Sequence, residues 1–137
     1  MTVAPAAGLL SLSALRERAA QVLAPASDED PQVLAAPVDA VDPPALVLSW
    51  GDPWVEFETP CFWYAQLAVI CFAGRVDPES GTETLEQLVA YTINRFRADA
   101  YTWPQQSAQA PRLLEINGLS LLAARVIVRA PVTLNGG

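Results

Sequence analysis

The side chains of this sequence best suited to acid–base chemistry are carboxylates, which occur in two closely spaced groups. Asp52, Glu56 and Glu58 form one group, and Asp77 and Glu79 flank a proline in the other. Paired carboxylates act as acid and base in glycosidases and hold cations in some metal enzymes. Acidic residues beside prolines and at alternate positions are also common in surface turns. We therefore expect no catalytic role for either group.

Several residue types on which common active sites depend are missing from the sequence. It contains neither histidine nor lysine, so it lacks the usual general base, a common metal ligand and the amine of a Schiff base. Its serines lie outside any nucleophile-elbow pattern, and it has no phosphate-binding loop or dinucleotide glycine fingerprint. These features predict a protein that is not an enzyme, with no catalytic residues, no cofactor and no metal site.

Two cysteines, Cys61 and Cys71, lie in the most apolar stretch of the chain, which is predicted to be a strand. Along one extended strand they are separated by about 33 Å, whereas the Cα atoms of a disulfide lie about 4.4 to 6.8 Å apart. They therefore cannot pair within that strand. We predict two buried structural thiols rather than a disulfide framework or a metal site.

The charge balance limits the partners of the chain. Its net charge is −7, and its 8 positive charges are all arginine. Affinity for nucleic acid depends largely on Lys and Arg that neutralise phosphates, so this balance argues against tight nucleic-acid binding. No apolar run reaches the roughly 18 to 20 residues of a membrane-spanning helix, and the first residues lack the basic start of a secretory signal. We expect a cytoplasmic product that does not bind membranes.

The apolar composition and the aromatic residues indicate contacts with other chains. Hydrophobic residues make up 52% of the sequence and charged residues 17%, which indicates either apolar surface covered by a partner or simply an alanine-rich composition. Tryptophan and arginine anchor many interfaces. The alternatives are core packing for the tryptophans and ordinary surface positions for the arginines. The interface candidates are Trp50, Trp54, Trp63, Trp103, Arg95, Arg125 and Arg129.

Two segments have helical periodicity. In the N-terminal helical segment 9–26, apolar residues recur at helical spacing over 9–24, with Ser11 or Ser13 as the N-cap and Pro25 at the end. A second helix is predicted to begin near 81 or 82 and to extend to 99, with Ser80 and Glu83 at the spacing of a capping box. Its apolar face consists of Leu85, Leu88, Val89, Thr92, Ile93 and Phe96.

The remaining segments predict strands and connections. Prolines and acids over 27–44 favour an extended connector around the body of the domain. Strands are predicted over 45–50 and 54–58, with a turn at 51–53, and over 61–73, which is apolar on both faces and therefore central or covered by another subunit. After a polar loop at 101–111, Asn117-Gly118 predicts a type I′ hairpin between 112–116 and 119–132.

Together these elements predict one α+β domain covering 1–137. It consists of the N-terminal helix (9–26), the extended connector (27–44) and an α+β core (45–132). In that core, a four-stranded and mainly antiparallel sheet has the order β-β-α-β-β, and the helix packs on one face.

Three strings in the core suggest a family. They are VLSWGDPW at 47–54, TPCFWYA at 59–65 and GRVDPESGTETLEQLV at 74–89. In overall pattern the chain resembles the tail terminator proteins of long-tailed, siphovirus-type phages that infect actinobacteria. The similarity covers about 45–132, the N-terminal helix is compatible with it, and none of the strings is a catalytic motif.

The resemblance implies a virion protein at the head–tail junction, assembled in the host cytoplasm. Such a subunit forms a hexameric ring at the head-proximal end of the tail tube, binds the tail-tube protein to end its polymerisation, and joins the tail to a head-completion protein. Double-stranded DNA passes through the ring without sequence-specific binding. The helix 82–99 and the long hairpin are the expected contacts between neighbouring copies.

Two alternatives stay open at this point. A head-completion or neck connector protein has the same size range and ring symmetry, but it binds the portal-side adaptor instead of the tail-tube protein. A small-ligand or peptide-binding module uses Trp50, Trp54 and Trp63 as a pocket. The second alternative predicts a monomer whose tryptophan fluorescence responds to its ligand.

Overall fold

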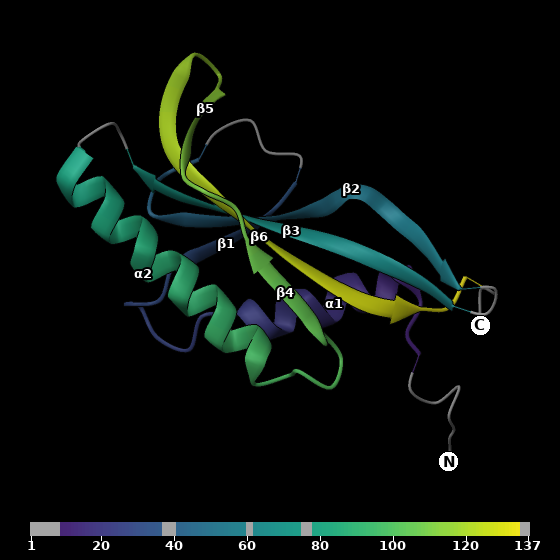
Figure 1. Ribbon diagram of the computed structural model, residues 1–137. Helices are drawn as coiled ribbons and strands as arrows, with labels where there is room; N and C mark the ends of the chain where they lie inside the picture. The colour runs from purple at the N-terminus through teal and green to yellow at the C-terminus, as the bar shows by residue number, and fades with distance from the viewer. Residues whose placement is uncertain (1–8, 37–40, 60–61, 75–77, 135–137) are drawn as a thin grey trace.

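A computed structural model describes residues 9–36, 41–59, 62–74 and 78–134 of the chain. In this part of the chain, two helices pack against one β-sheet, so the predicted α+β class is confirmed (Figure 1). In chain order the elements are α1 (Leu12–Leu23), β1 (Gln32–Ala35), β2 (Ala45–Thr59), β3 (Phe62–Gly74), α2 (Pro78–Arg97), β4 (Gln105–Ala108), β5 (Arg112–Ile116) and β6 (Leu119–Val132).

The sheet is larger than the sequence predicts. Its six strands, counted over the described residues, follow the order β1-β2-β3-β6-β4, and β5 pairs with β6 as well. β1 lies parallel to β2, whereas the other pairs are antiparallel, so the sheet is mixed. The prediction of four strands in β-β-α-β-β order is therefore wrong in strand number, although one antiparallel pair, β2 and β3, precedes α2 and another, β5 and β6, follows it.

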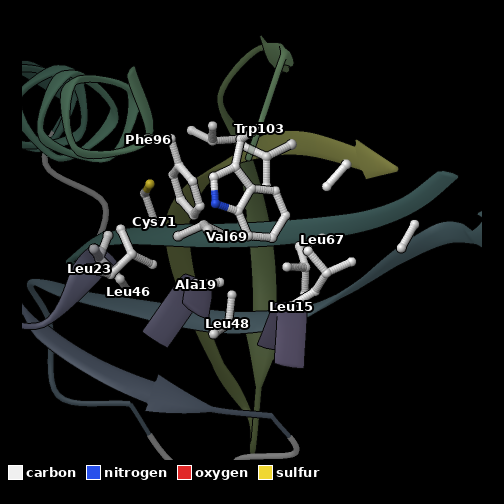
Figure 2. Packing of buried hydrophobic residues seen from close by; sticks show 14 of the residues in the cluster. Leu15, Ala19, Leu23, Leu46, Leu48, Leu67, Val69, Cys71, Phe96 and Trp103 are labelled. Atoms are coloured by element: carbon white, nitrogen blue, oxygen red, sulfur yellow. The ribbon is translucent and has the colours of Figure 1, made fainter. Parts of the chain in front are cut away.

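The main core lies between the helices and one face of the sheet. Alternate residues of β2, β3 and β6 point toward the helices because successive side chains of a strand point to opposite faces. They pack with Leu15, Ala19 and Leu23 of α1 and with Phe96 of α2, as Figure 2 shows. We call this side of the sheet the helix face and the opposite side the open face.

Both helices follow their predicted periodicity. Ser11 is the N-cap of α1, and its side chain accepts a hydrogen bond from the amide of Ala14. In α2, Leu85, Leu88, Thr92 and Phe96 are buried, which confirms the predicted apolar face. α2 begins at Pro78, before the predicted start, and the side chains of the predicted capping box cannot both be placed because Ser80 lies outside the described side chains. Helices of the described chain are too short or too polar to cross a membrane.

The predicted turn at 51–53 is instead part of one long strand. β2 continues from Ala45 to Thr59 beside β3, and the pairing register shifts between Trp50 and Val55. The shift in register accommodates Gly51-Asp52-Pro53 as extra residues within the strand, as a β-bulge does, so the strand continues past them. A Cβ atom at Gly51 would lie 2.8 Å from the Cβ of Gln66, so the two strands approach closely there.

Two segments predicted as irregular form short strands. Within the predicted connector 27–44, β1 pairs with residues 45–48 of β2. Within the predicted polar loop 101–111, β4 pairs with residues 126–129 of β6. Each is an edge strand of only four residues. Such a short strand is stabilised by pairing with its long neighbour, and four residues are too few to show a clear periodic pattern in the sequence.

The Asn117-Gly118 hairpin is confirmed. β5 and β6 pair from Ile116 opposite Leu119 outward, and Asn117 and Gly118 have φ values of 51° and 84°. These left-handed conformations are those that a type I′ turn requires at both central positions. In Figure 1 the hairpin curls away from the body of the sheet.

Candidate assembly interface

The aromatic side chains gather on one arm of the sheet. The far ends of β2, β3 and β6 extend beyond α2 (Figure 1), and on this arm Trp50 stacks against Trp54 and Phe57 against Trp63, with ring centroids 5.2 and 4.8 Å apart. Trp54, Phe57 and Trp63 are 48%, 52% and 40% exposed. We call this end of the sheet, with these four aromatic residues, the aromatic arm. Exposed aromatic side chains gathered at one end of a sheet are typical of contact sites for other proteins.

The opposite side of the same arm is held by polar contacts around Arg129. Its guanidinium donates to Glu56 at 3.1 Å and to Gln105 at 2.6 Å, and lies 4.7 Å from the ring centroid of Tyr64. These contacts join β2, β3, β4 and β6. Arg129, predicted as an interface candidate, therefore has a structural role within the chain, and Glu56 from the predicted carboxylate group is its ion-pair partner.

Trp103 does not lie on any surface. Its side chain is fully buried and packs edge-on against Phe96, with ring centroids 5.3 Å apart (Figure 2). The turn after α2 directs it inward, because the amides of Thr102 and Trp103 both donate to the carbonyl of Asp99. The prediction that Trp103 anchors an interface is therefore wrong, and the alternative, packing in the core, holds for this tryptophan.

The two remaining arginine candidates differ in their surroundings. Arg95 lies over the ring of Tyr91, at 5.3 Å from its centroid, and donates to the carbonyl of Ala24, so it ties α2 to the end of α1. Arg125 is half-buried on the open face of the sheet and forms no ion pair within the described residues. Arg125 therefore remains the candidate with a charge available to a partner.

The predicted carboxylate groups can be placed only in part among the described side chains. Among them, no group of His, Cys, Asp and Glu is arranged to hold a metal ion. Asp52 lies on the arm, while the side chains of Glu58, Asp77 and Glu79 lie outside the described residues. No protein-family model and no curated protein matches this chain.

Two hollows beside α2 were not predicted from the sequence. One, of about 500 Å³, is an acidic groove lined by Asp28, Glu29, Asp30 and Asp42 and by the middle of α2. The other, of about 410 Å³, is a mainly apolar pocket between α2 and the segment that follows β4. The acids were visible as a run in the sequence, but folding is required to bring Asp42 beside the other three.

The one cysteine in the described chain, Cys71, is buried under α2, with its Sγ 3.7 Å from the hydroxyl of Thr92. Burial raises the pKa of this thiol from 9.0 to about 11, although the contact with Thr92 opposes the shift. The thiol therefore stays protonated at neutral pH and is no nucleophile. The prediction of a buried structural thiol is confirmed for Cys71, whereas Cys61 lies outside the described residues.

Because the pKa of Cys71 is raised, the stability of the fold is expected to decrease at alkaline pH. Below pH 9 the thiol is protonated in both states, and between 9.0 and about 11 the unfolded chain loses the proton while the folded chain retains it. We expect the free energy of unfolding to fall across this window, by about 1.4 kcal/mol for each unit between the two pKa values. Urea denaturation at several pH values measures it. Cys71→Ala should lack this part of the pH dependence, and an unchanged slope in that variant would contradict the assignment.

Proposed function

We propose that this protein is a structural assembly subunit that forms a ring at the head-proximal end of a phage tail tube and ends tube polymerisation there. The observation that carries the proposal is the aromatic arm, on which Trp54, Phe57 and Trp63 are exposed. Such a surface is stabilised when a partner covers it. The resemblance of 45–132 to tail terminator proteins supplies the kind of partner.

The direction of the arm supports a contact with the tube. The arm continues along β2, β3 and β6, so it points along the strands, whereas neighbouring copies in a ring must meet at the sides of the subunit. We assign the arm to the tail-tube protein and the two faces of the subunit away from the arm to copies of the same chain. The head-completion protein then binds the surface of the ring away from the tube, and DNA passes through the centre.

The test is electron microscopy of tail tubes polymerised with and without this chain. We expect rings at one end of each tube and a tube length that stops increasing once the chain is added. Tubes that elongate freely and carry no ring would overturn the proposal. Binding to the portal-side adaptor in the same experiment would favour a head-completion role, and a monomer whose tryptophan fluorescence changes with a small ligand would favour a binding module.

A further inference from the structure

The open face of the sheet is only partly covered by the chain itself. Near the β5–β6 hairpin, Val47, Phe72, Leu121 and Ala123 form a small buried cluster with residues of β1, β5 and the connector. No helix of the described chain contributes to that cluster. Ile70 packs against this cluster as well. Arg125 and Ile127 are half-buried, and Ile127 belongs to neither hydrophobic cluster of the described chain. A sheet with one face on the core leaves its second face for water or for a partner.

The open face carries positive charge on β5 and β6. Val126 and Val128 belong to the core on the helix face, so Arg125 and Ile127 point to the other side. Arg112 pairs opposite Ala123 on β5, which makes Arg112 and Arg125 diagonal neighbours on the same face, with Cα atoms about 7 to 8 Å apart. Neither arginine forms an ion pair with any residue that the structure describes.

The acidic groove lies on the other side of the molecule. Its walls are the loop before β1, the end of the connector and α2, so it belongs to the helix side of the sheet. Asp28 and Asp42 are exposed there, and within the described chain they have no cationic partner. Arg112 and Arg125 on the open face thus have no ion-pair partner within the described chain, and the same holds for Asp28 and Asp42 in the groove.

We propose that the arginine-bearing open face of one copy docks against the acidic groove of a second copy of this chain. The inference rests on the self-association part of the proposed function and names the surfaces that carry it. Two copies cannot join through the same surface, because arginine would meet arginine or carboxylate would meet carboxylate. Each copy instead uses one surface for each of two neighbours, and such head-to-tail contacts close into a ring when the rotation between copies allows.

Charge reversal on the two surfaces tests the contact. The sheet-face variant carries Arg112→Glu and Arg125→Glu, and the groove variant carries Asp28→Arg and Asp42→Arg. We expect sedimentation velocity to show that each variant alone has lost self-association, because like charges then face one another. An equimolar mixture should regain it, and native mass spectrometry should show closed assemblies in which the two variants are present in equal numbers.

Controls separate this contact from a general effect of charge. Arg16→Glu and Glu17→Arg make the same types of change at exposed positions of α1, and both should assemble as the wild type does. Circular dichroism checks that every variant is folded. Self-association of the wild type should weaken as salt is added.

The outcomes distinguish this inference from the proposed function. Rings formed by both charge-reversed variants alone, or a mixture of folded variants that stays monomeric, would overturn the assigned surfaces while leaving the wild-type ring intact. A wild-type chain that is monomeric both alone and at the tube end would overturn the ring and the assigned contact together. Regained assembly in the mixture, with both variants inactive alone, would establish the head-to-tail contact.

Discussion

Replacing Trp103 with alanine is expected to lower the free energy of unfolding by about 3 to 5 kcal/mol, the usual cost of removing a buried aromatic side chain. The side chain is fully buried against Phe96, so its removal leaves a cavity between α2 and the sheet. Urea denaturation followed by circular dichroism measures the change. Trp54→Ala removes an equally large side chain that is 48% exposed, and it should change the stability by less than about 1 kcal/mol.

A second substitution at Trp103 separates packing from hydrogen bonding. The indole Nε1 of Trp103 is buried without a hydrogen-bond partner among the described residues. Trp103→Phe removes that unpaired donor and keeps an aromatic ring, so the two effects oppose each other. We expect Trp103→Phe to lower the free energy of unfolding by less than half as much as Trp103→Ala does. Equal losses in the two variants would show that the donor has a partner in solution.

Replacing both Trp54 and Trp63 with alanine is expected to abolish tube capping without unfolding the protein. Exposed tryptophans that become buried in an interface are frequent hot spots, and truncating one commonly costs 2 kcal/mol or more, about 30-fold in affinity. Counting capped tubes by electron microscopy over a range of protein concentrations measures the effect. Assembly of the chain with itself should persist, because the assigned contacts between copies lie on the faces of the sheet and not on the arm.

Tyr101→Ala is the matched control for the arm. Tyr101 is 88% exposed in the turn after α2, so this substitution removes an exposed aromatic side chain from a different part of the surface. It should leave capping unchanged. Normal capping by the Trp54→Ala/Trp63→Ala variant, or an equal loss in Tyr101→Ala, would remove the arm from the tube contact.

The parts of the fold that the sequence predicts are those governed by local patterns. The two helices have apolar residues at helical spacing, and the type I′ turn needs positive φ at Asn117 and Gly118. The continuous β2 was not predicted because Gly51-Asp52-Pro53 favours a turn locally, whereas pairing with β3 on both sides of it keeps the strand extended. β1 and β4 depend on neighbours distant in the sequence, which periodicity does not report.

The same distinction between local patterns and tertiary contacts applies to the candidate surfaces. Clustering of tryptophans near the predicted turn at 51–53 indicated the aromatic arm, because Trp54 and Trp63 lie on β2 and β3, which follow each other in the sequence and pair. Whether one tryptophan is buried or exposed depends on tertiary packing, so Trp103 could not be distinguished from the others by its residue type. The acidic groove needs Asp28 and Asp42 to meet across the connector, and no spacing rule along the chain reports that contact.

The position of β6 has a consequence for synthesis of the protein. β6 follows all the other elements along the sequence, yet it lies inside the sheet and pairs with β3 on one side and with β4 and β5 on the other. On the ribosome, the edge of β3 stays unpaired until residues 119–132 emerge, and an unpaired edge is prone to aggregation. Arg125, one of the residues assigned to the copy-to-copy contact, belongs to this strand. A nascent chain therefore gains its assembly surface only in the same step that completes its sheet.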